Sequence, residues 1–456
     1  MLKNLAERIY RFSTTGLCSL CLFLFAYACV VLERPAVGIC ALALYLCLLC
    51  LCHGDVLPLV LPLLLIYCLT FYCPSAVWLA YLGIPCGLAL FWRLWCNRHA
   101  MCLGKSFFGL VAVSLALVLG GIGSISAEEY FSPGAVYILL ALGPMMIAMY
   151  LLLNSSLSQP RHYDIGEYIS TVMYATAVFV AFLILRIFLT HPEILIAQDH
   201  VVHKLEALVG WRNGASNLAV ILLPFIFYYA RRHSPWHLLS ALAVYVIVAL
   251  AGARAAIVIG ALTLLIGFAY FTHRRPWLRL AIVCACLACC AVAFVYREPL
   301  IIFARDFLCI DLSGAQVEDE PRYKLLLRSL EDFLHNPLFG RGLGYTGNND
   351  IYPLDPTVTP DAVRFRVHWY HSLLPQIIGS MGIVGILAYG YQFFLRLRVM
   401  LRVRRTAYTG ALILSYVVAL LYSQIDPGIF SPMPFGLLVV LTIALLEAEP
   451  ERPQTA

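Results

Sequence analysis

The chain has 456 residues, of which 62% are hydrophobic and only 12% are charged, and its mean hydropathy is +0.85. Soluble domains carry about 25% charged residues, so this composition excludes a soluble globular protein and indicates an integral membrane protein. The net charge of +6 does not require a nucleic acid partner. Basic cytoplasmic loops that face an anionic inner leaflet account for it.

Apolar segments recur along the whole chain at roughly the 20-residue length that spans a bilayer as a helix. They predict an all-α polytopic membrane protein with about 12 to 14 transmembrane helices. The first segment follows Lys3, Arg8 and Arg11 and lacks a small-residue cleavage site. We therefore expect a retained anchor rather than a signal peptide. The candidate spans are 14–32, 36–52, 56–73, 75–95, 107–123, 134–153, 168–190, 216–230, 237–252, 255–271, 277–296, 370–395, 410–424 and 432–447.

Loop charge sets the expected orientation. If the N-terminus is cytoplasmic and every span crosses, most lysines and arginines fall in cytoplasmic segments, as the positive-inside rule requires. Residues 297–368 are then one large periplasmic loop. We expect three regions: N-terminal transmembrane helices at 1–204, a catalytic region at 205–396 that includes this loop, and a basic cytoplasmic loop with C-terminal transmembrane helices at 397–456.

The periplasmic loop is predicted to carry an amphipathic helix. Pro321 stands at a first-turn position, and apolar residues recur at helical spacing from Leu326 to Leu334. Asn336 and Pro337 end the pattern. Pro is favoured in a first turn and stops a helix elsewhere, so both boundaries have a physical cause.

Several patterns that suggest a cofactor have simpler explanations. Residues 342–347 match G-x-G-x-x-G, but no strand precedes them and no helix follows, which excludes a dinucleotide site. The cysteines at 284–290 lie within a span without histidine or carboxylate neighbours, and there they act as small hydrophobes. The acidic run 318–320 is an alternative divalent-cation site, although acidic residues before a helix normally compensate its dipole. We expect no metal and no other cofactor.

Three arginines are candidate ligands for an anionic substrate. Arg254 interrupts a long apolar stretch, where a charge at mid-bilayer costs about 2.5–3.5 kcal/mol or more. We therefore expect two helices that turn at Gly252 on the outer side and leave the guanidinium in a cavity; a snorkelling arginine is the alternative. Arg322 begins the loop helix, and Arg212 lies near Asn217, although solvated arginines are common at both kinds of position. The planar guanidinium suits diphosphate oxygens.

Two histidines stand at the mouth of the span that follows the loop. Imidazole titrates near neutral pH, so His371 can take a proton from an incoming hydroxyl. Gly382 and Gly385 share its helix face and allow another helix to pack closely while the histidine is held at the mouth. For His368, beside Trp369, an interfacial position is the favoured alternative.

These pieces occur in a characteristic order: G-A-R-A-A at Arg254, E-P-R-Y-K at Arg322, then H-N-P-L-F-G-R-G-L-G and H-S-L-L-P-Q-I-I-G. Over roughly residues 205–395 the chain resembles the O-antigen ligase and polymerase superfamily of bacterial inner membranes. The resemblance implies a C-type membrane glycosyltransferase that takes a saccharide from undecaprenyl diphosphate on the periplasmic side, without metal or nucleotide. It departs from the family at Ser372, where asparagine is common.

The resemblance also assigns roles. It implies that His371 is the general base on the acceptor hydroxyl and that Arg254 and Arg322 hold the diphosphate. The further predicted contacts with diphosphate or saccharide are Arg212, Asn217, His368 and Arg341.

The acceptor is open at this point. The lipid A core is our first choice, because it is the superfamily's commonest ligase acceptor. A growing glycan (polymerase) and a serine or threonine of an exported protein such as pilin are the alternatives. A lipid-saccharide flippase is the non-enzyme alternative, but it predicts repeat symmetry and charges at the midplane, whereas the unusual residues here gather in external segments. Expected partners are the lipid-linked donor, the acceptor and membrane lipid.

Overall fold

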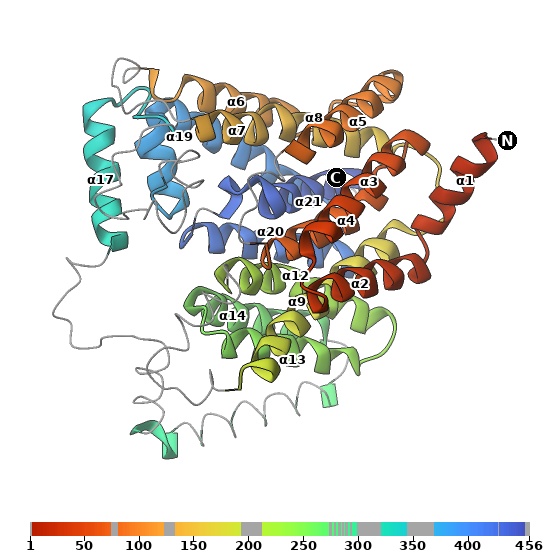
Figure 1. Cartoon of the computed structure of the whole chain (residues 1–456). Coiled ribbons are helices and arrows are strands. Elements are labelled where there is room, and N and C mark those ends of the chain that lie inside the picture. Colours follow the sequence, from red (N-terminus) through yellow and green to blue (C-terminus); the bar gives the residue numbers. More distant parts are fainter. Residues whose placement is uncertain are drawn as a thin grey trace, which may run out of the picture.

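The computed structural model describes residues 2–73, 81–122, 133–192, 212–272, 321–343, 369–426 and 428–451, with single positions between 276 and 298. Within these residues every regular element is helical, apart from one isolated bridge between Val403 and Glu451 (Figure 1). The predicted all-α class is therefore confirmed. The main helices are α1 (Leu2–Ser13), α2 (Gly16–Val31), α3 (Pro35–Cys52), α4 (Val60–Thr70), α5 (Gly83–Cys96), α6 (Phe107–Leu119), α7 (Pro133–Leu142), α8 (Pro144–Leu157), α9 (Ile165–Thr190), α12 (Arg212–Arg232), α13 (His237–Leu250), α14 (Arg254–Phe271), α17 (Pro321–His335), α19 (Leu373–Arg402), α20 (Ala407–Ser423) and α21 (Leu437–Ala448).

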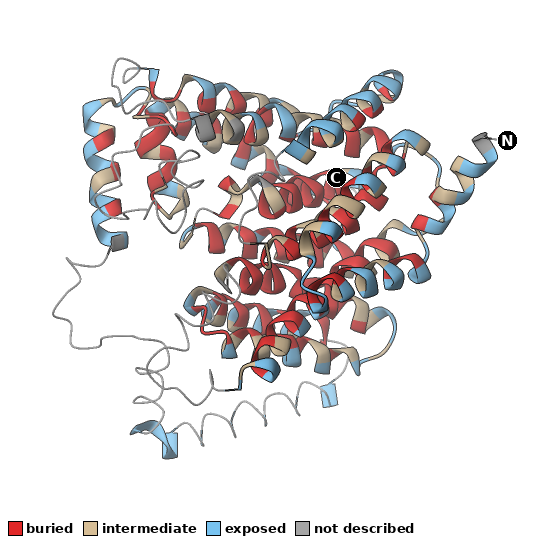
Figure 2. Ribbon diagram, viewed as in Figure 1, coloured by how far each residue is buried: buried red, intermediate tan, exposed pale blue. Residues whose placement is uncertain are grey.

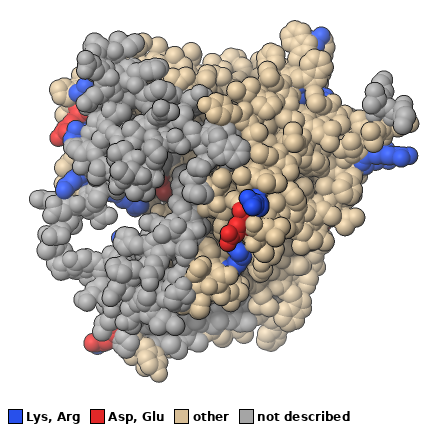
Figure 3. All heavy atoms as spheres, in the orientation of Figure 1, with Lys and Arg blue, Asp and Glu red and all other residues tan. Residues whose placement is uncertain are grey.

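The helices have the length and apolarity of a multi-pass membrane protein. Among the described residues, six helices are long and apolar enough to cross a bilayer, or seven if a bent pair counts as one span. Six further apolar helices have 10–17 residues. In the view of Figure 3 most of the described surface carries neither acidic nor basic side chains, as expected of a surface that faces lipid.

Three predicted spans differ from the observed helices. The charged N-terminus forms its own helix, α1, which is bent by 73° from α2. The span predicted at 134–153 is two helices, because Pro144 begins a new helix directly after the break at Gly143. The span predicted at 370–395 begins at Leu373, continues to Arg402 and is interrupted at Gly382.

Helix α12 forms the centre of the bundle. In its most apolar 18-residue stretch 89% of the residues are buried, whereas the share is 39% in α3 and in α14. It packs against α9, α13, α14 and α20, and Figure 2 shows the buried residues concentrated in this middle region. A helix that is apolar on all sides belongs in such a position. A smaller apolar cluster, between α6 and α19, includes Ala116, Ile377 and Met381.

Contacts along α20 set the directions of its neighbours. The rings of Tyr228 near the end of α12 and Tyr408 near the start of α20 lie 5.4 Å apart. Tyr270, near the end of α14, donates a hydrogen bond to the carbonyl of Thr406 at 3.2 Å. Both helices therefore run antiparallel to α20, and their N-termini lie at the end of the bundle where α20 finishes. We call this the α17 end, because α17 stands there (left in Figure 1).

Candidate functional site

A break in α19 shapes the α17 end. Gly382 has φ +59° and ψ −148°, a conformation outside the helical region. The backbone groups freed by this break are bonded to segment 337–342, which follows α17. Arg341 N donates to Gly379 O at 2.8 Å and Gly342 N to Ser380 O at 2.9 Å. Across the break, Ile383 N donates to Pro337 O at 2.8 Å. The interrupted helix is thus completed by another part of the chain.

Two glycines make this close approach possible. A Cβ on Gly382 would lie 2.4 Å from Pro337 O, and one on Gly340 would lie 2.5 Å from Met381 N. Gly340 also has a positive φ, +65°. Only glycine, which lacks a Cβ, can adopt these torsion angles at such short distances from another backbone segment. Segment 337–342, which leads into the G-x-G-x-x-G pattern, is therefore a docking element for α19.

A buried carboxylate joins α17 to the start of α19. Asp332 is 3% exposed, and its carboxylate accepts a hydrogen bond from the Tyr370 hydroxyl at 2.6 Å. Arg341 Nε lies 3.4 Å from the other oxygen of the same carboxylate. Tyr370 in turn lies across Gly379, where a Cβ would be 2.4 Å from the phenol ring. Side chains from α17, from segment 337–342 and from the residues just before α19 thus meet at Asp332.

His371 follows Tyr370 and has a constrained backbone. Its φ of +51° is in the left-handed region, which a non-glycine residue adopts only when the surroundings impose it. Tyr370 N donates to the Gln376 side chain at 2.9 Å, and the Ser372 hydroxyl donates to Gln424 O at 2.9 Å. These bonds on either side of His371 hold its position.

The His371 side chain faces a carboxylate from the segment that follows α20. Its Nδ1 lies 3.6 Å from Asp426 Oδ1, and the two side chains are 33% and 22% exposed. The other oxygen of Asp426 accepts a hydrogen bond from the Tyr422 hydroxyl at 2.6 Å. Since Nδ1 faces the carboxylate, Nε2 is the ring nitrogen placed to accept a proton. We call these three residues the His371 cluster.

Arg322 lies near the His371 cluster. It is exposed in the first turn of α17, the helix that stands at this end of the bundle. Arg254 is the first residue of α14, so it lies at the same end of the bundle. The predicted turn between α13 and α14 is confirmed, but the side chain of Arg254 is exposed rather than enclosed by the described residues. The charge therefore lies at a helix end and not at mid-span.

The remaining predicted contacts differ in what surrounds them. Asn217 is 2% exposed, and its amide donates a hydrogen bond to the carbonyl of Asn213 in its own helix. Arg341 interacts with Asp332 as described above. Arg212 is the first residue of α12, at the α17 end, and its side chain is outside the described residues. His368 and the acidic run 318–320 are also outside them. Within the described part of the chain no group of three metal-ligating side chains occurs.

Sequence reasoning missed Asp332, Tyr422 and Asp426. A signal for Asp426 was present, because it is the only acidic residue between Asp361 and Glu447. An isolated carboxylate at the end of an apolar helix is costly unless it is paired or functional. Asp332 looked like one of several charges on the wet face of α17, and no sequence pattern distinguishes it.

Comparison with known proteins finds one matching family. Residues 238–390 match the O-antigen ligase family. This segment includes Arg254, Arg322 and His371, whereas Asp426 and Tyr422 lie beyond it. No curated protein and no solved structure matches the chain. Members of the matched family are ligase- or polymerase-type glycosyltransferases that act on saccharides in membranes. Over residues 238–390 the chain is thus similar to the O-antigen ligase family, which supports the resemblance to the O-antigen ligase and polymerase superfamily.

Proposed function

We propose that this protein transfers an O-antigen-type saccharide from undecaprenyl diphosphate to an acceptor hydroxyl at the α17 end of the bundle. The observation that carries the proposal is the His371 cluster. A histidine with one ring nitrogen against a carboxylate and the other available is suited to act as a general base. The distance of 3.6 Å exceeds that of a direct hydrogen bond, but such contacts commonly tighten when substrate binds.

The proton and the leaving group follow separate routes in this reaction. His371 Nε2 takes the proton of the acceptor hydroxyl while the hydroxyl oxygen forms a bond to the anomeric carbon. The bond between that carbon and the diphosphate oxygen breaks, and undecaprenyl diphosphate leaves with the electron pair. Asp426 stabilises the imidazolium that forms, because opposite charges attract strongly in a site shielded from water.

Arg322 and Arg254 are the proposed ligands of the diphosphate. Negative charge develops on the leaving group, and positioned guanidinium groups stabilise it. The position of Arg322 relative to His371 is set by one helix, because Asp332 on α17 bonds to Tyr370, the residue before His371. We keep Arg212 and His368 as proposed further contacts. For Asn217 and Arg341 we propose that they also support the site's backbone.

The proposed site faces the periplasm, on the outer side of a bacterial inner membrane. The distribution of basic residues supports this orientation, since Arg398, Arg402, Arg404 and Arg405 gather at the opposite end of α19. Single cysteines at Leu334, which is 76% exposed on α17, and at Arg402 test the topology. An impermeant maleimide should label the first in intact spheroplasts and the second only after lysis. Labelling of both from one side contradicts the orientation.

The lipid A core is the proposed acceptor, and His371→Ala in a host that depends on this protein tests it. Donor should still reach the periplasmic leaflet and accumulate there, because arginine binding does not need the imidazole. Loss of a ligase leaves polymer on undecaprenyl diphosphate and an uncapped core. Loss of a polymerase leaves single repeats on a capped core. Loss of a protein transferase leaves lipopolysaccharide normal and an exported protein lighter by one glycan.

A flippase gives the opposite result in the same experiment. Its loss strands the donor on the cytoplasmic leaflet, which contradicts the enzymatic proposal. Unchanged glycans in all three pools would mean that His371 only anchors the helix at the interface.

A further inference from the structure

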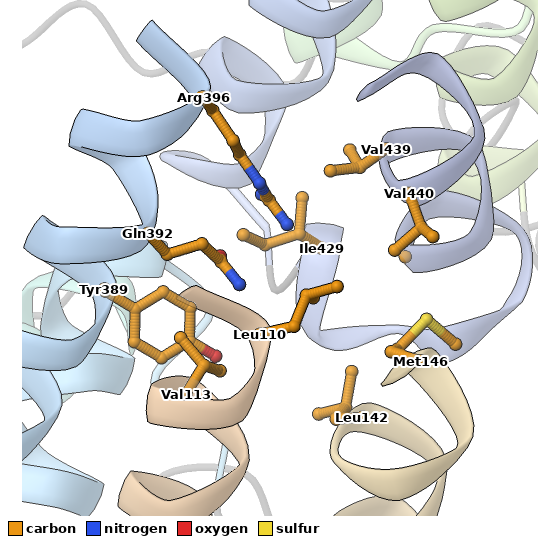
Figure 4. A pocket seen from close by; sticks show the side chains of 11 residues that line it. Leu110, Val113, Leu142, Met146, Tyr389, Gln392, Arg396, Ile429, Val439 and Val440 are labelled. Carbon is orange, nitrogen blue, oxygen red and sulfur yellow. The ribbon is translucent and has the colours of Figure 1, made fainter. Parts of the chain in front are cut away.

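A second polar feature lies inside the bundle, away from the His371 cluster. Arg396 on α19 is 5% exposed and Gln392, one turn before it, is 4% exposed. Arg396 follows His371 by roughly 35 Å of chain at the helical rise per residue. Both side chains point into a cavity of about 40 Å³ between α6, α8, α19 and α21 (Figure 4).

The described residues compensate the charge of Arg396 poorly. Its Nε is buried and has no hydrogen-bond partner among the described residues. The described part of the chain supplies no carboxylate partner for it, and its guanidinium carbon lies 5.9 Å from the centre of the Tyr416 ring. Such a cation–π contact offsets only part of the cost of burying a charge. A buried, ionised side chain within a membrane bundle normally marks a functional site.

The walls of the cavity define what fits. Leu110, Val113, Met146 and Val440 make most of the lining apolar, and Gln392 adds an amide donor. Gly436 and Val439, where a π-helical turn runs into α21, also line it. A buried guanidinium and an amide donor thus face one largely apolar space, which favours an anionic group.

The volume restricts the anion further. A cavity of about 40 Å³ has room for a few water molecules or for a small anionic group such as a phosphate. The surrounding helices are apolar, and α19 is long enough to cross a membrane, so a phosphate-bearing molecule that reaches this cavity is expected to have apolar chains as well. We propose that Arg396 and Gln392 form a binding site for the phosphate of a membrane lipid, distinct from the His371 cluster.

Native mass spectrometry of delipidated protein in detergent tests the proposal. Phosphatidylglycerol and undecaprenyl phosphate carry the phosphate in two kinds of lipid, diacylglycerol is the uncharged control, and inorganic phosphate tests the group alone. We expect at least tenfold preference for the phosphorylated lipids over diacylglycerol. Arg396→Gln should reduce their binding about 10- to 100-fold, the range for losing a charge-assisted hydrogen bond. Arg398→Gln is the matched control, because that arginine is exposed on the same helix.

The comparison between lipids identifies the source. Tighter binding of phosphatidylglycerol assigns the site to bulk lipid, and tighter binding of undecaprenyl phosphate assigns it to the carrier lipid. Competition by inorganic phosphate supports recognition of the phosphate itself. Equal binding of diacylglycerol, or unchanged binding by Arg396→Gln, overturns the proposal and leaves a water-filled cavity around the arginine.

A second variant guards against misfolding of Arg396→Gln. Val440→Phe keeps the charge and fills the cavity, so it should abolish the preference for phosphorylated lipids while the midpoint of thermal unfolding is retained. Binding by Val440→Phe equal to that of the unmodified protein would show that the lipid binds elsewhere.

Discussion

Replacing Asp426 by asparagine separates the carboxylate's charge from its shape. In the proposed reaction His371 becomes an imidazolium, and its Nδ1 lies 3.6 Å from Asp426 Oδ1. At that distance two opposite unit charges attract by about 1 kcal/mol in water and by about 4–5 kcal/mol at the effective dielectric constant near a protein surface. The two side chains are 33% and 22% exposed, so we expect a loss of about 2 kcal/mol, or about thirtyfold in rate.

The assay is saccharide transfer by purified protein in proteoliposomes, with donor concentration varied. Asp426→Asn should lower kcat and leave the KM for the lipid-linked donor unchanged, because the arginines bind the donor. Tyr422→Phe is the companion variant. It removes the hydrogen bond to Asp426 but retains the carboxylate's charge, so its loss of rate should be smaller. A rate for Asp426→Asn within twofold of the unmodified protein would refute the role of this carboxylate.

Three further predictions concern other parts of the structure. Gly382→Ala should destabilise the protein by about 3 kcal/mol, because the residue has a positive φ and an added Cβ would clash with Pro337 O. Gly390→Ala is the control, since nothing lies near an added Cβ there, and it should be neutral or stabilising in thermal unfolding. Equal effects of the two variants would contradict the docking of segment 337–342. Arg322→Lys should fold normally but lose most of the transfer activity, since a lysine cannot make a bidentate contact with a diphosphate. Full activity of this variant would show that Arg322 is only a solvated surface residue. Asp55 is 4% exposed between α3 and α4, and its carboxylate lies 3.2 Å from Arg161 Nε. Burial raises the pKa of Asp55, but the Arg161 guanidinium and hydroxyl donors lower it more, to below its ordinary value. Asp55→Asn should therefore cost about 3–5 kcal/mol at neutral pH, with the difference shrinking as pH falls below about 4; a constant difference down to pH 3 would contradict this.

Local sequence patterns predicted most of the helices. Spans of uniform apolarity were visible because a membrane helix must satisfy its backbone internally and face lipid. The limits of α17 followed from two prolines, and the turn before Arg254 followed from the cost of a buried charge. Each of these features is determined by residues that are close together in the chain.

The parts that were not predicted depend on contacts between distant segments. Asp426 contacts His371 only because α20 ends beside the start of α19. The local sequence around either residue gives no sign of this contact. Gly382 was expected to allow close helix packing, but it allows a break that the turn around Gly340 completes. The hydrogen bond from the Asn217 amide to its own helix was not predicted either, although local bonding of this kind is common for a buried amide; the contact of Asn217 with substrate stays a prediction.

Purified protein with His371 replaced by alanine gives the most direct test of the central claim. The measurement pairs two quantities in the same proteoliposomes: binding of the undecaprenyl-diphosphate-linked saccharide, and its transfer to the acceptor in the presence of EDTA. We predict that the unmodified protein transfers the saccharide under these conditions. His371→Ala should bind donor with unchanged affinity and reduce transfer by at least about 100-fold, the usual range for loss of a general base. Transfer by His371→Ala at a rate close to that of the unmodified protein would contradict it.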